Sequence, residues 1–449
     1  MTENKGDQRL QGNNFLHAAE IIGDKLCDEA FWFDDRCNWI GRALDDVIDR
    51  NSPPANMALL PDLYGGTSGI ALFLSNLYLL TKKDVYKKTS EGSIIQALSR
   101  LEDLPVISRF GVYSGQLGIA YSSYKVGLSL DLPPLIEKSS QILRNLYANM
   151  ETEHLMDIIT GNAGAIPTLL YMNELLDEEY VLDFAFKLGK ELILSAVKES
   201  SGWSWDYRAN GVKNSIHNLT GYAHGAAGIG CALFELFEKT DNREFFEGAI
   251  QAFKYEDAWF NKKFDNWPDF RTYLDPNRSS INSNSTHTSS IQSENKQYSY
   301  AVAWCHGAPG IGLSRLRVSQ ILKDEKYQDD IHASLRIIKG VVERIINIDE
   351  NATHNNDFSL CHGLAGLGEI LLYATSVLGD ESYFFLTQKL GSYGVEKFQK
   401  RGLPWPCGVK TSETPGLMLG TAGIGNFYLR LHDADKVTTP LIIIPTNTT

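Results

Sequence analysis

Two cysteine–histidine pairs, Cys305-His306 and Cys361-His362, combine the residue types in this chain that are best suited to metal chemistry. Each pair stands directly before a glycine that recurs three residues later, and His224 stands before another such pair of glycines without a cysteine. Cysteine thiolates and imidazole nitrogens are ligands that zinc prefers. These five side chains therefore predict a metal site, provided that the fold brings them together.

An internal repeat could bring these side chains together. The motif Gly-x-x-Gly, followed by a run of small and aliphatic residues, occurs seven times at intervals of 46 to 82 residues. Its first glycines are Gly66, Gly115, Gly161, Gly225, Gly307, Gly363 and Gly420. The helix expected after each glycine pair is apolar around most of its circumference, and the helix expected before it has one polar face. Each repeat is therefore predicted to be a helical hairpin with one inner and one outer helix.

Seven such hairpins favour an all-α fold, a closed α/α toroid whose inner helices surround a central axis. An open helical solenoid has the same local pattern. It would be expected to begin and end with polar capping helices, whereas both ends of this chain have the pattern of ordinary repeats. In a ring, equivalent positions of adjacent repeats lie side by side at one rim. The repeats that contain His224, Cys305 and Cys361 are consecutive, so these residues are expected to share that rim.

A single buried cysteine usually packs as a small hydrophobic side chain. Here two cysteines occupy equivalent repeat positions and each is followed by histidine, which favours a metal site over inert packing. A Cys₂His set with an open fourth position is typical of a catalytic zinc ion. Cys305 and Cys361 are the expected ligands, and one of the three histidines His224, His306 and His362 completes the set.

Asp157 lies four residues before Gly161, in the repeat next to that of His224. A carboxylate beside an imidazole orients it or raises its pKa, which suits a general acid or base. Aspartate before a helix is also a common cap, and Asp62 has the equivalent place in repeat one with no histidine motif nearby. The residues alone leave both interpretations of Asp157 open.

Composition and charge exclude several classes of function. A net charge of −13 without a large basic cluster argues against a nucleic-acid partner. No apolar run approaches the roughly 20 residues that span a bilayer, so membrane insertion is not expected. The polar N-terminus has no apolar signal core, and six cysteines in 449 residues do not make a disulfide scaffold, so a cytoplasmic protein is expected.

One toroid domain (residues 15–437) is expected to take up nearly the whole chain. A polar N-terminal extension (residues 1–14) precedes it, and a C-terminal tail (residues 438–449), a terminal strand or packing arm, follows it. Residues 277–297 are rich in Ser, Asn and Thr, which predicts a mobile loop.

Four motifs, in this order, resemble those of the lanthionine synthetase cyclase family, most closely the C-terminal cyclase half of class II (bifunctional) lanthipeptide synthetases. The resemblance runs from about Phe15 to Leu431. The motifs are Asp157-Ile158-Ile159-Thr160-Gly161-Asn162-Ala163-Gly164, His224-Gly225-Ala226-Ala227-Gly228, Trp304-Cys305-His306-Gly307-Ala308-Pro309-Gly310 and Leu360-Cys361-His362-Gly363.

The resemblance implies an α/α toroid with one zinc ion held by Cys305, Cys361 and His362, and with His224 and Asp157 assisting proton transfer. The implied reaction is a Michael-type addition, in which a substrate cysteine attacks the β-carbon of a dehydroalanine or dehydrobutyrine in the same peptide and closes a thioether ring. The implied partners are a dehydrated precursor peptide and a dehydratase domain or protein.

The chain departs from the stand-alone class I cyclases at two positions. Those enzymes have tyrosine after the first zinc cysteine and arginine four residues before it, where this chain has His306 and Ala301. A histidine at this position resembles the class II enzymes. His306 is expected to act in proton transfer or to lie beside the zinc ligands. Class II enzymes also carry a dehydratase half, for which seven repeats in 449 residues leave no room. An excised cyclase domain or a free-standing cyclase with a separate dehydratase is therefore expected.

Other functions remain open at this level. The same zinc site could add glutathione to dehydrated residues, as the eukaryotic relatives of this family imply, and the toroid could bind peptides without catalysis. A glycosidase on a similar toroid would need a pair of catalytic carboxylates, and none is evident beside the predicted rim.

Overall fold

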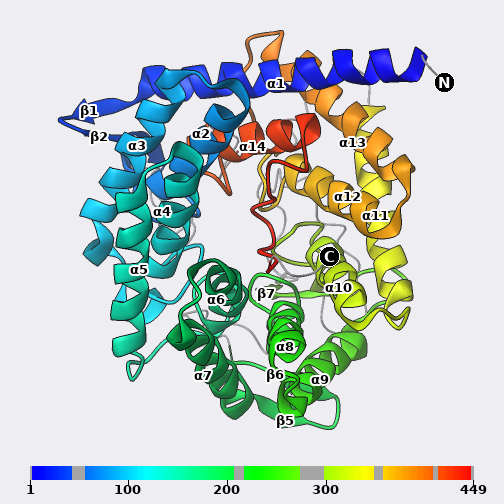
Figure 1. Ribbon diagram of the computed structural model, residues 1–449. Coiled ribbons are helices and arrows are strands. Elements are labelled where there is room, and N and C mark those ends of the chain that lie inside the picture. The colour runs from blue at the N-terminus through cyan, green and yellow to red at the C-terminus, as the bar shows by residue number, and fades with distance from the viewer. Residues whose placement is uncertain are drawn as a thin grey trace. The chain divides into compact units, whose positions relative to one another are not determined.

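The computed structural model describes residues 3–42, 56–206, 217–273, 298–347, 357–407 and 413–445 (Figure 1). The loop predicted at residues 277–297 lies outside them. The chain divides into two compact units. The first unit comprises Met1–Met150, Ile346–Leu372 and Asp380–Ile442, and the second comprises Glu151–Ile345, Tyr373–Gly379 and Ile443–Thr449.

Seven inner helices each begin directly after the first glycine of a repeat, as predicted. They are α2 (Thr67–Thr81), α4 (Gln116–Leu130), α6 (Asn162–Leu176), α8 (Ala226–Thr240), α10 (Ala308–Leu322), α12 (Leu364–Leu378) and α14 (Thr421–His432). The first eleven residues of α2, α6, α8 and α10 are all buried. A helix that is apolar around its circumference is stable only when other elements cover every side of it.

The outer helices have one buried face and one polar face. They are α1 (Glu3–Glu29), α3 (Asp84–Ser99), α5 (Pro133–Ala148), α7 (Glu179–Ser195), α9 (Arg243–Trp259), α11 (Gln328–Ile346) and α13 (Glu381–Gly394). In α7 the buried residues include Val181, Phe184 and Leu188, spaced by three or four as the hydrophobic pattern predicts. Inner and outer helices pack as hairpins in α2/α3 and α4/α5 of the first unit and in α6/α7 and α8/α9 of the second.

Helix α1 packs against α14 in the first unit, although the two lie at opposite ends of the chain (Figure 1). Its backbone is helical from Glu3, so the polar segment predicted as an extension continues the first outer helix. After α14, the described part of the tail forms no strand. It packs as an arm, because Tyr113 Oη donates to the carbonyl oxygen of Pro440 (2.7 Å) and Leu441 is buried. The domain boundaries themselves stay a prediction.

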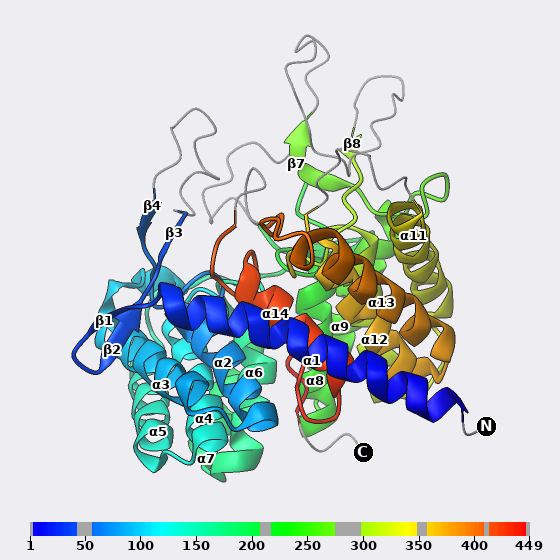
Figure 2. The same cartoon turned by 90° about the horizontal axis from the view of Figure 1, so that it is seen from above.

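Short strands lie between the helices and form four antiparallel pairs in the described residues. The pairs are β1 (Phe31–Phe33) with β2 (Arg36–Asn38), β3 (Ile40–Arg42) with β4 (Asn56–Ala58), β5 (Val197–Glu199) with β6 (Gly202–Ser204), and β7 (Asp269–Tyr273) with β8 (Tyr298–Ser299). Figure 2 shows β7 beside β8, which are paired through Asp269 and Ser299. Two 3₁₀ turns, η2 (Leu101–Asp103) and η3 (Val106–Ser108), and one π turn, η5 (Val395–Gln399), complete the elements. None of the described helices has both the length and the apolar character needed to cross a membrane.

Close backbone packing requires the second glycine of the motif, as the fourth and fifth repeats show. A Cβ atom on Gly310 would overlap with the carbonyl oxygen of Trp304, and one on Gly228 would overlap with that of Tyr222. The loop before each inner helix therefore lies against the first turn of that helix, at a distance that only glycine permits. Gly307 also has a positive φ of 84°, which glycine adopts without strain.

Candidate active site

In the second unit, backbone hydrogen bonds join the loops of three consecutive repeats. The amide of Ile158 donates to the carbonyl oxygen of Ala223 (3.0 Å), and the amide of Ala223 donates to that of Cys305 (3.1 Å). Ala223 and Cys305 are equivalent positions of the repeat, two residues before the first glycine. In the third repeat the position equivalent to Ala223 and Cys305 is Ile159. The residue that makes the hydrogen bond is Ile158, one position earlier.

The first unit has the same pattern of bonds between equivalent residues. The amide of Cys361 donates to the carbonyl oxygen of Met418 (2.9 Å), and the amide of Met418 donates to the carbonyl oxygen of Tyr64 (2.7 Å). The amide of Tyr64 donates in turn to the carbonyl oxygen of Tyr113 (2.8 Å). These contacts place the loops in the register expected from the repeat. In each unit, adjacent loops therefore present the same position side by side.

Asp157 makes both of the contacts that the sequence left open, one with its own loop and one with a histidine. Its Oδ1 caps the loop by accepting hydrogen bonds from the amide (2.6 Å) and hydroxyl (2.7 Å) of Thr160. Its Oδ2 lies 2.7 Å from Nδ1 of His224. Because a carboxylate only accepts, this contact places the proton of a neutral His224 on Nδ1 and leaves Nε2 as a base.

His306 lies against His224, with ring centroids 5.6 Å apart and an angle of 28° between the rings. Its side chain is buried, and neither ring nitrogen has a hydrogen-bond partner among the described residues. Burial, followed by the charge of Arg271, lowers the pKa of His306 to about 4. His306 is therefore a neutral imidazole packed against His224.

In the first unit, Cys361 is buried and His362 is partly exposed. Nε2 of His362 lies 3.1 Å from a carboxylate oxygen of Asp357, whose other oxygen accepts from the amide of Ser359 (2.7 Å). A carboxylate on one imidazole nitrogen is typical of histidines that bind a metal through the other, because it orients the ring and raises its basicity. The surroundings of His362 therefore suit a zinc ligand that binds through Nδ1.

Sequence reasoning missed two side chains that hold the loops of the second unit in place. Oε1 of the buried Glu256 accepts from the amides of Gly221 (3.0 Å) and Ala227 (2.7 Å), on either side of His224. Oδ1 of Asn266 accepts from the amide of Ala308 (2.7 Å), the first residue of α10. Neither Glu256 nor Asn266 belongs to the repeated motif. Comparison of the repeats with one another and the hydrophobic periodicity therefore gave no signal for either residue.

A family model described as "Lanthionine synthetase C-like protein" matches residues 58–443. The chain belongs to this family. It is 24% identical over 408 residues to the lacticin 481/lactococcin biosynthesis protein LcnDR2 of Lactococcus lactis subsp. lactis, a match that covers 87% of this chain and 37% of LcnDR2. It is also 26% identical over 349 residues to the nisin biosynthesis protein NisC of the same organism, covering 71% of this chain and 74% of NisC.

Among solved structures, nisin cyclase is similar with a TM-score of 0.60 and 21% sequence identity, over 84% of this chain and 90% of nisin cyclase. At this identity the likeness shows the fold, which is an α/α toroid. The all-α toroid expected for this lanthionine synthetase C-like protein is therefore confirmed.

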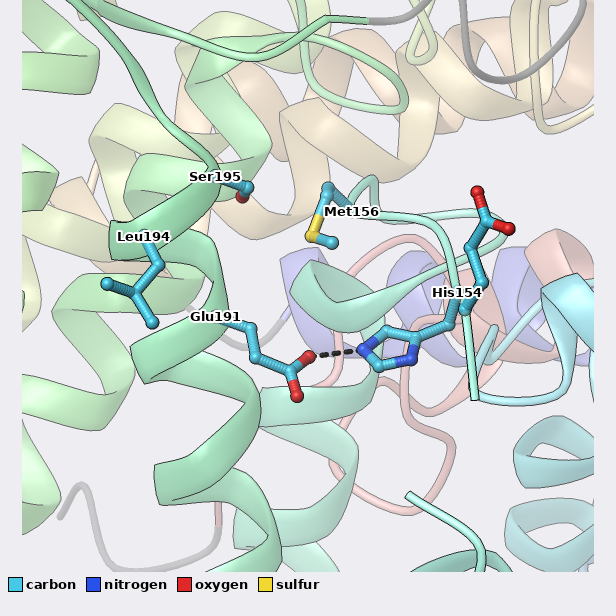
Figure 3. A pocket seen from close by; sticks show the side chains of 6 residues that line it. His154, Met156, Glu191, Leu194 and Ser195 are labelled. Atoms are coloured by element: carbon cyan, nitrogen blue, oxygen red, sulfur yellow. Dashed lines mark hydrogen bonds and ion pairs between the residues drawn. The ribbon is translucent and has the colours of Figure 1, made fainter. Parts of the chain in front are cut away.

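A surface pocket of about 390 Å³ lies beside the Asp157 loop of this family member (Figure 3). Glu191 of α7 points toward the imidazole of His154 and is paired with Nε2 of that ring. The same Glu191 oxygen accepts from the amide side chain of Asn162 (3.0 Å), the first residue of α6. Because His154 is only three residues before Asp157, these contacts tie the Asp157 loop to α6 and α7.

The four cysteines outside the repeated motif are buried or half-buried and have the character of packing residues. Burial raises the pKa of Cys27 to about 11 and the pKa of Cys37 and Cys407 to about 12. Burial raises the pKa of Cys231, inside α8, further still. Such thiols stay protonated at neutral pH and are poor nucleophiles.

Proposed function

We propose that this lanthionine synthetase C-like protein is a zinc-dependent lanthionine and methyllanthionine cyclase. It would add cysteine thiolates of a dehydrated lanthipeptide precursor to dehydroalanine and dehydrobutyrine residues of the same peptide. The contact between Asp157 and His224 is the observation that carries the proposal, because it supplies an oriented acid and base one loop away from a cysteine. The similarity to proteins of nisin and lacticin 481 biosynthesis supports the class of substrate.

The zinc ion would be held by Cys305, Cys361 and His362. Two thiolates and one imidazole are a donor set that zinc prefers, and three protein ligands leave a fourth position open. When bound, zinc would keep the protein cysteines as thiolates and lower the pKa of a substrate thiol. The carboxylate of Asp357 would orient His362 for this role.

His224 would move the proton that the reaction transfers. Its Nε2 would accept the proton of the substrate thiol, while Asp157 holds Nδ1–H and stabilises the resulting imidazolium. The thiolate then forms a C–S bond with the β-carbon, and the electrons of the double bond move toward the carbonyl group to give an enolate. Protonation of the α-carbon completes the addition. His306, stacked on His224, is proposed to assist this proton transfer and to exclude water from it.

The proposed partners are the dehydrated precursor peptide and a dehydratase domain or protein that prepares it. We also propose a cytoplasmic site of action, because the cytoplasm is a reducing compartment that suits cysteines acting as metal ligands.

A direct test measures bound zinc and ring formation for the purified chain and for Cys361→Ala. Ring closure consumes a free thiol, so mass spectrometry after thiol alkylation counts the rings formed on a dehydrated peptide. Cys361→Ala is expected to lose both zinc and activity. Cys231→Ala is the matched control, because Cys231 is also buried but lies inside α8, and it is expected to retain both.

Ring formation at the parental rate by a zinc-free Cys361→Ala chain would contradict the zinc mechanism. Two further outcomes identify the alternatives. Faster addition of free glutathione than of the peptide's own cysteine would indicate a glutathione-transferring enzyme. Peptide binding that is insensitive to a chelator, without turnover, would indicate a toroid that only binds peptides.

A further inference from the structure

We infer that Glu256 is a positioning residue for ring closure, whose carboxyl group fixes the His224 loop (residues 219–227) against the segment that carries Cys305 and His306. The inference rests on the proposed cyclase function and adds to it a residue that acts only through the protein backbone. Glu256 is fully buried in the outer helix α9, outside the repeated motif.

Helix α8 begins without a side chain of its own to cap it. The first amides of an α-helix have no acceptor within the helix and need a partner outside it. The N-cap residue of α8 is Gly225, which supplies no side-chain acceptor. Oε1 of Glu256 accepts instead from the amide of Ala227 (2.7 Å), the second residue of α8. The outer helix α9 therefore caps the inner helix of its own hairpin (Figure 1).

The same oxygen of Glu256 also holds the other end of the His224 loop. Oε1 accepts from the amide of Gly221 (3.0 Å). Gly221 is three residues before His224, and Ala227 is three residues after it. One buried oxygen atom thus fixes both ends of a segment whose middle residue is the proposed base.

Gly221 is also the point at which the His224 loop lies against the next loop. Its φ of 108° is a conformation that glycine adopts without strain. A Cβ atom on Gly221 would lie 3.1 Å from the carbonyl oxygen of Cys305, and 3.3 Å from Cα and 3.4 Å from Nδ1 of His306. The backbone at Gly221 therefore packs directly on the segment that carries a proposed zinc ligand. Because Glu256 holds the amide of Gly221, it fixes this contact as well as the place of His224.

The main chain of Glu256 joins the same brace to the core between α8 and α10. Its carbonyl oxygen accepts from the indole nitrogen of Trp267 (3.0 Å). The Trp267 side chain is fully buried in one cluster with Ala227 of α8 and Ala308 of α10. The position of Glu256 is therefore set by the core itself, which makes its carboxyl group a rigid support for the loop.

Helix α10 has a cap that does not depend on the Glu256 side chain. Its N-cap residue, Gly307, supplies no side-chain acceptor. Oδ1 of Asn266 accepts from the amide of Ala308 (2.7 Å), the first residue of α10. Loss of the Glu256 carboxyl group is thus expected to move the His224 loop and to leave the start of α10, next to Cys305, in place.

Ring closure is sensitive to such a movement. A general base must lie within about 2.6–3.2 Å of the atom whose proton it takes, and a misplacement of about 1 Å can lower a rate about 10²-fold. An oxygen that accepts two amides is present in a carboxylate, in a neutral carboxyl group and in a side-chain amide. Glu256→Gln is therefore expected to keep the loop in place. Glu256→Met has a similar length but no oxygen, so it is expected to release the loop.

The test measures kcat, KM and bound zinc for the parent chain and both variants, on a synthetic peptide with one dehydroalanine and one cysteine. Glu256→Met is expected to lower kcat about 10²-fold with KM and zinc stoichiometry unchanged. Glu256→Gln is expected to keep the parental kcat. Ser93→Ala is the control, because Oγ of Ser93 in α3 donates to the carbonyl oxygen of Thr67 (2.7 Å), the first residue of α2. It also removes a buried bond between an outer and an inner helix, and no change in kcat is expected.

A double variant separates the positioning of His224 from general damage to the fold. Asp157→Asn is expected to disable the same base, because the carboxylate of Asp157 holds the proton of His224 on Nδ1. If Glu256 acts through His224, Asp157→Asn/Glu256→Met loses little more activity than Asp157→Asn alone, since residues that act as a unit are not additive. Losses that multiply in full would overturn the inference, because Glu256 would then act independently of His224.

Two results with single variants would also overturn the role of Glu256. One is a folded, zinc-loaded Glu256→Met chain with parental kcat, and the other is an equal loss of kcat in Glu256→Gln and Glu256→Met. If Glu256→Met loses helical signal, Glu256→Asp decides the matter, because its carboxyl group is one methylene too short to reach both amides. Parental kcat in that folded variant would exclude a need for the two bonds, and lowered kcat with bound zinc would support it. A parent chain that forms no ring would instead overturn the proposed function, and this inference with it.

Discussion

The carboxylate of Asp157 bridges two repeats, with one oxygen 2.7 Å from Nδ1 of His224 and the other accepting the amide of Thr160. One side chain therefore makes a structural contact and a second contact that we propose to be catalytic. The two roles are separable by mutation, because asparagine keeps an oxygen for the cap and replaces the other oxygen with a donor.

We expect Asp157→Asn to fold normally and to lower kcat for ring formation about 10²- to 10⁴-fold, the usual contribution of acid–base catalysis. The new amide N–H would donate to Nδ1 of His224 and shift the imidazole proton to Nε2, where the base is needed. Single-turnover assays on a dehydrated peptide measure the effect. Asp62→Asn is the control, because buried Asp62 accepts from the amide of Gly65 (2.8 Å) in repeat one. Equal losses in the two variants would show that only the cap matters.

Gly310→Ala is expected to destabilise the second unit by about 1–3 kcal/mol, the usual cost of overpacking, and to weaken zinc binding. The added methyl group would overlap with the carbonyl oxygen of Trp304 and displace the neighbouring Cys305. Urea denaturation and zinc titration measure the two effects. Gly340→Ala is the matched control, because Gly340 is exposed in α11 with no atom within 4 Å of the added Cβ, and it is expected to stabilise the helix by up to about 1 kcal/mol. A neutral Gly310→Ala would contradict the steric account.

The buried ion pair between Glu235 of α8 and Arg317 of α10 joins two adjacent inner helices. Nε and Nη2 of Arg317 donate to Oε1 (2.5 Å) and Oε2 (2.8 Å) of Glu235. Glu235→Leu is expected to destabilise the fold by about 3–5 kcal/mol, because it leaves a buried cation whose remaining acidic partner among the described residues is the partly exposed Glu238. The double variant Glu235→Leu/Arg317→Met is expected to recover most of that loss. A double variant as unstable as Glu235→Leu would contradict this explanation.

Glu256 is expected to make stability depend on pH. Burial raises the pKa of Glu256 from 4.5 to about 8, although Arg315 and the amides of Gly221 and Ala227 favour the ionised form and Asp257 opposes it. The folded chain then holds a proton that the unfolded chain has lost. The resulting stability is present below pH 4.5 and is lost as pH rises to about 8.

Glu256→Gln removes this dependence because it cannot ionise. We expect the variant to gain stability relative to the parent chain between pH 4.5 and about 8, by an amount on the order of a few kcal/mol. The difference in urea midpoint, followed across this pH range, measures it. A constant difference would show that Glu256 is ionised throughout, held by its two backbone amides.

Much of the fold could be predicted because its signals are local. The glycine pairs mark where the inner helices begin, since backbone packing leaves no room for a Cβ at residues such as Gly228 and Gly310. The spacing of Val181, Phe184 and Leu188 identifies the buried face of α7 without knowledge of what covers it. Self-alignment likewise predicted the equivalence of Ala223 and Cys305, which a backbone hydrogen bond now joins.

The amino-acid sequence by itself determined the repeat, the starts of the inner helices, the toroid and the residues that could bind zinc, because each follows from composition and spacing along the chain. Only the tertiary structure decided that Asp157 both caps its loop and contacts His224, because the two residues are 67 positions apart. It also decided that His306 is buried and stacks on His224. Trp267 belongs to an interval between repeats, and only its long-range packing against Ala227 of α8 and Ala308 of α10 determines where this interval folds back.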